Sequence, residues 1–207
     1  LFNSFKGKLY ISDAPFKLPT AETFSGLQNY IDGLSKTGFL SAFGWSIFIT
    51  FFSTIVIVLF TAMTGWYITR SKTKVSTSLY FIFVFSMIVP FQMVMFTMSK
   101  VANMLNLDNP VGLIVLYLGF GAGLSIFMFS GFVKSIPIDI EEAALIDGCN
   151  PIKTFFLIVL PLLKPICITV AILNVMWIWN DYLLPSLVLK SDYKTIPMAV
   201  QYLRGGY

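Results

Sequence analysis

The stretch TGFLSAFGWSIFITFFSTIVIVLFTAMTGWYIT, residues 37–69, runs for 33 positions without a charged side chain. A helix needs about 20 apolar residues to cross the ~30 Å hydrocarbon core of a bilayer, because it rises ~1.5 Å per residue. Two further uncharged runs, of 25 residues each, cover 75–99 and 109–133. These lengths predict membrane-spanning helices.

The composition points to the same class. Hydrophobic residues make up 57% of the 207 positions and charged residues 12%, with a mean hydropathy of +0.80. A water-soluble domain of this size needs a more polar coat. The net charge of +4 is spread over separate loops, which argues against a nucleic-acid partner. With no histidine and two cysteines outside any ligand spacing, we expect no metal site, no cofactor and no His-based catalytic triad.

A fourth apolar run is interrupted by charge. Lys164 precedes the uncharged residues 165–180, and Asp181 follows them. The segment can still span if Lys164 extends to one interface and Asp181 lies toward the other. Because lipid offers the backbone no hydrogen bonds, spans of this kind must be helical. The sequence therefore predicts an all-α integral membrane protein, a multi-span helical bundle with spans near 40–69, 76–98, 111–133 and 163–186.

The loop charges predict an orientation. Arg70, Lys72 and Lys74 cluster just after the first span, and an excess of Lys and Arg marks cytoplasmic loops. With four spans, the loop at 134–162 lies on the same side as residues 70–75. We expect a transmembrane domain over 39–189, with external segments at 1–38 and 190–207.

Glycines in the third run predict a packing face. Gly119 and Gly123 stand four residues apart, so they share one side of a helix. Small residues at this spacing let another helix approach closely. We expect tight packing within the bundle there.

The loop at 134–162 carries signals for two short helices joined by a sharp turn. Ser135-Ile136-Pro137 predicts a helix start, and Gly148 a stop, since glycine readily takes a positive φ. Asn150-Pro151 repeats the start signal, and Pro161 ends or bends the second helix.

Charge in the first short helix is not confined to one face. Asp139, Glu141, Glu142 and Asp147 spread around the axis at 100° per residue, whereas a helix lying on lipid segregates its charges. This pattern indicates contact with protein. An ordinary connecting loop with well-capped helices is the alternative.

The spacing of this loop resembles a known family. Glu142-Ala143-Ala144, followed by Gly148 and then Ile158-Val159-Leu160-Pro161, resembles the EAA loop of binding-protein-dependent ABC import permeases. The resemblance implies a bundle of the type I importer kind, whose cytoplasmic coupling helices sit in a groove of an ABC ATPase dimer. The implied coupling residues are Glu141, Glu142, Ala143, Ala144, Asp147, Gly148, Ile158, Leu160 and Pro161.

A second stretch resembles one branch of that family. Trp179-Asn180-Asp181-Tyr182, followed by Pro185, is similar to a segment of the maltose-type carbohydrate permeases. This implies sugar or oligosaccharide import across a bacterial or archaeal cell membrane. The implied partners are membrane lipid, a second permease expected to be a different sister subunit, and an extracytoplasmic solute-binding protein. Since such permeases usually have six spans, we expect the first and last to lie outside this sequence.

Polar groups at membrane depth are the candidates for a substrate path, because they usually face a bundle interior or a pathway. The candidates are Gln92, Asn174, Trp177, Asn180 and Asp181. Asn180 and Asp181 have an alternative role as a structural patch that pairs helices near the outer surface.

ATP hydrolysis is not expected in this chain, because it contains no Gly-x-x-x-x-Gly-Lys-Ser/Thr phosphate loop. We expect a non-catalytic subunit whose partner ATPase binds ATP. A permease for amino acids, phosphate or polyamines is the alternative. An intramembrane enzyme and a secondary transporter are less favoured, since the former lacks a catalytic pair and the latter has no need of a docking loop.

Overall fold

The computed structural model describes residues 2–13 and 15–205, so positions 1, 14, 206 and 207 of the two expected external segments lie outside it. Within that range the chain is helical, apart from turns and one isolated antiparallel β-bridge between Lys6 and Phe24, and the all-α prediction is confirmed. The elements in order are η1 (Phe2–Phe5), α1 (Lys8–Asp13), α2 (Gln28–Lys36), α3 (Phe39–Ser71), α4 (Lys74–Ser86), α5 (Phe91–Met104), α6 (Pro110–Val133), α7 (Asp139–Ile146), α8 (Pro151–Thr154), η2 (Phe155–Val159), α9 (Leu160–Leu162), α10 (Lys164–Asn180), α11 (Leu183–Val188) and α12 (Ile196–Gly205).

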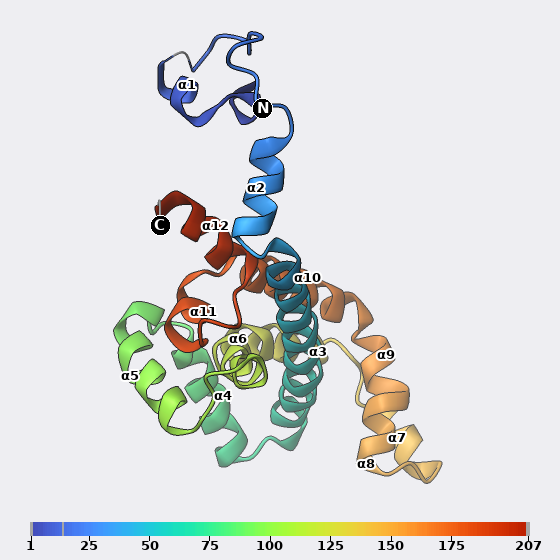
Figure 1. Cartoon of the computed structure of the whole chain (residues 1–207). Coiled ribbons are helices and arrows are strands. Elements are labelled where there is room, and N and C mark those ends of the chain that lie inside the picture. The colour runs from blue at the N-terminus through green and yellow to red at the C-terminus, as the bar shows by residue number, and fades with distance from the viewer. Residues whose placement is uncertain (1, 14, 206–207) are drawn as a thin grey trace.

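Helices α3 and α6 form the centre of the bundle (Figure 1). They are 33 and 24 residues long, which gives about 50 and 36 Å of helix, enough to cross a membrane. The two helices meet closely at Gly65, where an added Cβ would lie 2.8 Å from Cβ of Phe129 on α6. The close approach fixes α3 against α6.

The second expected span is not one straight helix. Helices α4 and α5 meet at an angle of 106°, so the expected span near 76–98 contains a sharp break. The break falls at Pro90, whose backbone is extended (ψ 136°) and which precedes α5. Proline lacks the N–H that a continuing helix needs and disfavours a helical conformation in the residue before it.

The fourth expected span is also divided. Helix α10 ends at Asn180, Asp181 is extended, and α11 begins only at Leu183. At its other end, α10 is bent by 78° from the helix that runs over Pro151–Leu162. By length and composition, two helices of the described chain are apolar enough to cross a membrane, and four spans result if each bent pair counts as one.

The loops at 70–75 and 134–162 lie at one end of the bundle, and α2 and α12 of the outer segments lie at the other (Figure 1). Near the start of α3, the amide of Ile196 on α12 donates a hydrogen bond to Oγ of Ser46 at 2.8 Å. Residues 2–13 and 15–26 form a small lobe that α2 joins to α3 (Figure 1), with Gly38 at the junction in the left-handed region (φ 59°).

The predicted glycine face is correct at one of its two positions. An added Cβ at Gly123 would lie 2.7 Å from the carbonyl oxygen of Phe83, so α4 crosses α6 there. At Gly119 the same Cβ would meet nothing within 4 Å. Helix α4 stops at Ser86 and turns away, which leaves Gly119 beside open space.

Replacing Gly65 by valine should destabilise the bundle by about 1–3 kcal/mol, because the side chain has no room against α6. The measurement is thermal unfolding of the purified protein in detergent. Gly131→Ala is the control. Gly131 lies on α6 with nothing within 4 Å of an added Cβ, and alanine favours a helix. Equal melting temperatures for the two variants would contradict the close α3–α6 approach.

Candidate functional site

The first candidate site is a helical arm, made of α7, the turn at Gly148, α8, η2 and α9, that projects from the bundle (Figure 1). The predicted start signal at Ser135 is wrong, because its Oγ donates to the carbonyl of Phe132 at the end of α6 and α7 begins four residues later. The predicted stop is correct: Gly148 has φ 83°, and the amide of Cys149 closes the helix end on Ala144.

The second half of the arm starts where the sequence predicts it. Oδ1 of Asn150 accepts a hydrogen bond from the amide of Lys153 at 2.9 Å, which caps α8. The helix then widens into the π-helical turn η2, in which the amide of Leu160 bonds to the carbonyl of Phe155, five residues back. Pro161 follows, and since it has no N–H to donate, the widened turn accommodates it. The sharp bend comes at Leu163, two residues after the proline.

Glu141 anchors the arm to the bundle. Its Oε2 accepts a hydrogen bond from Nε1 of Trp66 at 2.9 Å, and its Oε1 accepts one from Nε of Arg70 at 2.9 Å. Nη2 of Arg70 lies 2.8 Å from the same Oε1 and completes the ion pair. Nη2 of Arg70 also donates to the carbonyl of Ile136 at 2.9 Å. The carboxylate is buried and faces α3, so it differs from the outward-facing members of the predicted coupling set.

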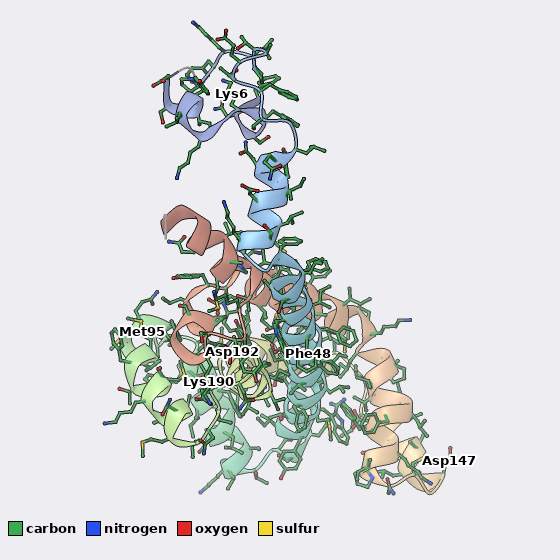
Figure 2. The ribbon with its side chains drawn as sticks, viewed as in Figure 1. Lys6, Phe48, Met95, Asp147, Lys190 and Asp192 are labelled. Atoms are coloured by element: carbon green, nitrogen blue, oxygen red, sulfur yellow. The ribbon has the colours of Figure 1, made fainter. Side chains whose placement is uncertain are left out.

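The tip of the arm is exposed and partly apolar. Ile146 is 86% exposed, and Glu142, Ala143, Asp147 and Gly148 are also exposed. Figure 2 shows Asp147 at the far end of the arm, away from the bundle. This apolar surface, flanked by carboxylates, has no cover within the described chain.

The other predicted coupling residues lie nearer the bundle. Ala144 is buried, Ile158 and Leu160 are half-buried, and Pro161 is exposed. These three later residues belong to η2 and α9, so they shape the stem of the arm and not its tip.

The two partners of Glu141, Trp66 and Arg70, were not identified from the sequence, although their spacing indicates a shared role. Trp66 and Arg70 are four residues apart and so share one face at the end of the first apolar run. An arginine and an indole N–H on one face, at the end of a span, require an acceptor if they are covered. The loop acids were available to supply it.

The second candidate site is a cavity of about 190 Å³ between α6 and α10. Its polar lining comes from Ser125, Asn174 and Trp177, and its floor from Gly121, where an added Cβ would lie 3.0 Å from Oδ1 of Asn174. Nδ2 of Asn174 donates to the carbonyl of Val170 at 2.9 Å and to Oγ of Ser125 at 3.4 Å. Its Oδ1 faces the glycine.

Of the five residues predicted for a substrate path, the structure brings two to this cavity. Asn180 lies at the exposed end of α10, where its Nδ2 donates to the carbonyl of Met176 at 2.7 Å. Asp181 caps α11 through the amide of Leu183 at 3.0 Å. Gln92 is exposed on α5 and is not part of the cavity lining.

Tyr117 connects this end of α10 to α6. Its hydroxyl donates to Oδ2 of Asp181 at 3.0 Å, and its ring meets that of Trp177 edge to face at 5.4 Å. The tyrosine is fully buried. Sequence alone showed it only as the single tyrosine of the 109–133 run and gave no sign of its partner.

Replacing Arg70 by methionine should release the arm, because it leaves the buried Glu141 carboxylate without its cation. Removing one partner of a buried ion pair costs about 3–5 kcal/mol. We expect faster proteolysis within 134–162, and the double variant Arg70→Met/Glu141→Met should recover most of the protection.

Lys190→Met is the control for that experiment. It breaks the more exposed pair of Lys190 with Asp108, which is worth about 1 kcal/mol or less, and should leave the arm protected. Equal cleavage in the Arg70 variant and the unmodified chain would show that the ion pair does not hold the arm.

Residues 57–204 match the family described as the binding-protein-dependent transport system inner membrane component. The chain is 40% identical over its whole length to the starch degradation products transport permease AmyC of Thermoanaerobacterium thermosulfurigenes, of which it covers 75%. It is 34% identical, again over 100% of the chain and 75% of the relative, to the multiple sugar-binding transport permease MsmG of Streptococcus mutans. The melibiose/raffinose/stachyose import permease MelC of Bacillus subtilis is 32% identical over 74% of the chain and 56% of the relative.

The fold has a solved counterpart. It matches a chain in the crystal structure of a bacterial ABC transporter involved in the import of the acidic polysaccharide alginate, with a TM-score of 0.75 and 23% identity over 99% of this chain and 70% of that one. The similarity of fold covers the bundle and the arm together. With a family match over more than half of its length, this chain belongs to the binding-protein-dependent transport system inner membrane components, the permeases of ABC importers.

Proposed function

We propose that the chain is the permease subunit of an ATP-driven importer of sugars or oligosaccharides. Relatives that are at least 30% identical are named for starch degradation products, multiple sugars, and melibiose, raffinose and stachyose. The Trp179–Tyr182 stretch, typical of carbohydrate permeases, supports the same cargo class. The permease lies in the cell membrane of a bacterium or archaeon, the inner membrane where there are two.

In this proposal the energy comes from a separate ATPase dimer that binds the tip of the arm. The observation that carries it is the exposure of Ile146 at that tip, with Glu142 and Asp147 beside it. Burial of an isoleucine side chain by a partner stabilises the complex by about 25 cal/mol for each Å² of apolar surface that is covered. The carboxylates would select a partner groove that carries positive charge.

The arm can transmit movement because it is held rigidly. Glu141 ties α7 to α3 through Trp66 and Arg70, and α3 is packed closely on α6 at Gly65. A displacement of the tip by the ATPase would therefore turn these helices as one body.

Asn174 and Trp177 are the proposed substrate-facing residues of this subunit. A planar amide beside an indole is the combination that binds a sugar, since the amide pairs with hydroxyl groups and the ring covers an apolar face. Asn180 and Asp181 are proposed to hold the ends of α10 and α11. The remainder of the path would come from a second, sister permease, which receives cargo from an extracytoplasmic solute-binding protein.

Ile146→Asp should abolish co-purification with the partner ATPase and ATP-dependent sugar uptake, because it places a charge at the centre of the apolar contact. The fold should be unaffected, since the side chain touches little of its own chain. Leu9→Asp is the control: Leu9 is 82% exposed but lies in the lobe at the opposite end. Normal ATPase association of the Ile146 variant would refute the docking proposal.

Asn174→Leu should reduce sugar uptake about tenfold, the effect of losing one good hydrogen bond, without loss of ATPase association. Radiolabelled oligosaccharide uptake into vesicles measures the rate and its dependence on sugar concentration. Asn180→Leu is matched in chemistry, but it lies outside the cavity and should leave the concentration dependence unchanged. The reverse ranking of the two variants would move the path to the end of α10.

A further inference from the structure

A polar pocket of about 300 Å³ lies at the arm's end of the bundle, between α3, α4 and α6. It is lined by Thr69, Lys72, Thr77, Tyr80, Ser130 and Lys134, with Ile68 and Phe81 at its apolar side. Two lysines, one directly after α3 and one directly after α6, thus line one pocket where the long apolar helices end. The transport function described above uses neither of them.

The two lysines have no carboxylate partner in the part of the chain that the structure describes. The ion pairs there join Lys36 to Asp32, Arg70 to Glu141 and Lys190 to Asp108. Nζ of Lys134 lies 6.0 Å from the ring centre of Tyr80, which holds it at the pocket. Both lysines are exposed, so the pocket presents two positive charges that an anion can reach.

The donors in the pocket suit a phosphate group. Each ammonium carries three N–H groups, and the hydroxyl of Tyr80 makes no hydrogen bond to any described residue. The hydroxyls of Thr69 and Thr77 already donate to carbonyls of their own helices, at 2.7 and 3.0 Å. The donors left for an anion are therefore those of the two lysines and the tyrosine.

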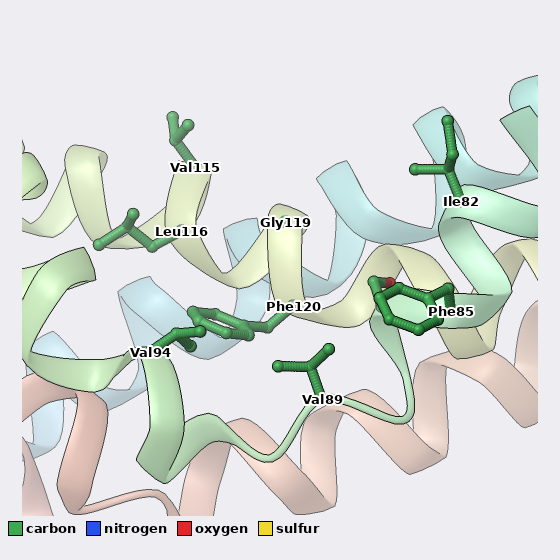
Figure 3. Close-up of a pocket in the computed structure, with 9 residues that line it drawn as sticks. Ile82, Phe85, Val89, Val94, Val115, Leu116, Gly119 and Phe120 are labelled. Atoms are coloured by element: carbon green, nitrogen blue, oxygen red, sulfur yellow. The ribbon is translucent and has the colours of Figure 1, made fainter.

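An apolar surface leads away from this pocket along α4. Phe81, Ile82 and Phe85 are each more than 60% exposed, and the last two line a second cavity of about 450 Å³ (Figure 3). Figure 3 shows this cavity between the bent α4–α5 pair and α6, next to Gly119. It is almost entirely apolar, with Val89, Val115 and Leu116 in its wall.

We infer that the polar pocket and the apolar cavity together bind one anionic phospholipid, with the phosphate between Lys72 and Lys134 and an acyl chain along α4 into the cavity. A free anion would use the first pocket only, whereas both pockets share helices α4 and α6 and are joined by exposed aromatic side chains. Basic pockets between helices at the membrane surface bind anionic headgroups in this way. The inference rests on the proposed membrane placement of α3 and α6 and not on the ATPase partner or the cargo.

The test uses the intact permease, purified in detergent without ATPase or sugar, and measures binding of radiolabelled phosphatidylglycerol and phosphatidylcholine. Lys72→Gln/Lys134→Gln should weaken phosphatidylglycerol binding about tenfold or more, because each lysine at a membrane surface contributes favourably to anionic lipid binding. Phosphatidylcholine binding should not change. Lys17→Gln/Lys100→Gln removes the same charge at exposed positions outside the pocket and should have no effect.

Two further measurements distinguish a bound phospholipid from a bound free anion. Gly119→Leu fills the apolar cavity and should weaken long-chain phosphatidylglycerol but not its short-chain form; equal effects on both would overturn the acyl-chain part. Displacement of the lipid by excess inorganic phosphate would show a soluble-anion site and overturn the lipid assignment. Loss of affinity in the control pair equal to that in the pocket pair would also overturn it. Lipid binding is measured without transport. Its result is therefore independent of the Ile146 and Asn174 experiments, which test the proposed function.

Discussion

The buried Glu141 carboxylate ties the first half of the arm to the bundle. Glu141 accepts hydrogen bonds from Trp66 and Arg70, and the same arginine reaches the carbonyl of Ile136. The charge is buried, so its desolvation is offset only while both Trp66 and Arg70 are in place. The arm also packs on the bundle through Phe155 and Val159 of η2, which share a buried core with Ala62 of α3 and Phe129 of α6. The carboxylate adds a polar anchor that fixes α7, the half of the arm with the proposed docking surface, against α3.

The fold could be predicted well from sequence where a feature is local. The uncharged run at 37–69 gave α3, and the cap at Asn150 and the positive φ at Gly148 gave the turn of the arm. The length of an apolar run does not show whether its helix is straight. The run at 75–99 contains a bend of 106° near Pro90, and the expected span near 163–186 contains a break at Asp181. A proline in an apolar run marks a break, but its angle depends on packing elsewhere.

The sequence also predicted only those features of the two candidate sites that depend on local spacing. The spacing from Glu142 to Pro161 identified the arm, yet it could not separate the inward-facing Glu141 from the exposed Glu142, because that depends on a partner 71 residues away, Arg70. Likewise Asn174 and Asp181 both appeared as polar residues of one span. Only the structure assigns the first to a cavity wall and the second to the cap of α11, where it also bonds Tyr117.

The geometry of the arm has a mechanical consequence. It continues from α6 on one side, joins α10 at the bend by Leu163 on the other, and is fastened to α3 by the Glu141 carboxylate in between. The arm is therefore attached to three different helices. In the proposed coupling, a push on the tip would act on α3, α6 and α10 at once, with the length of α7 and α8 as the lever.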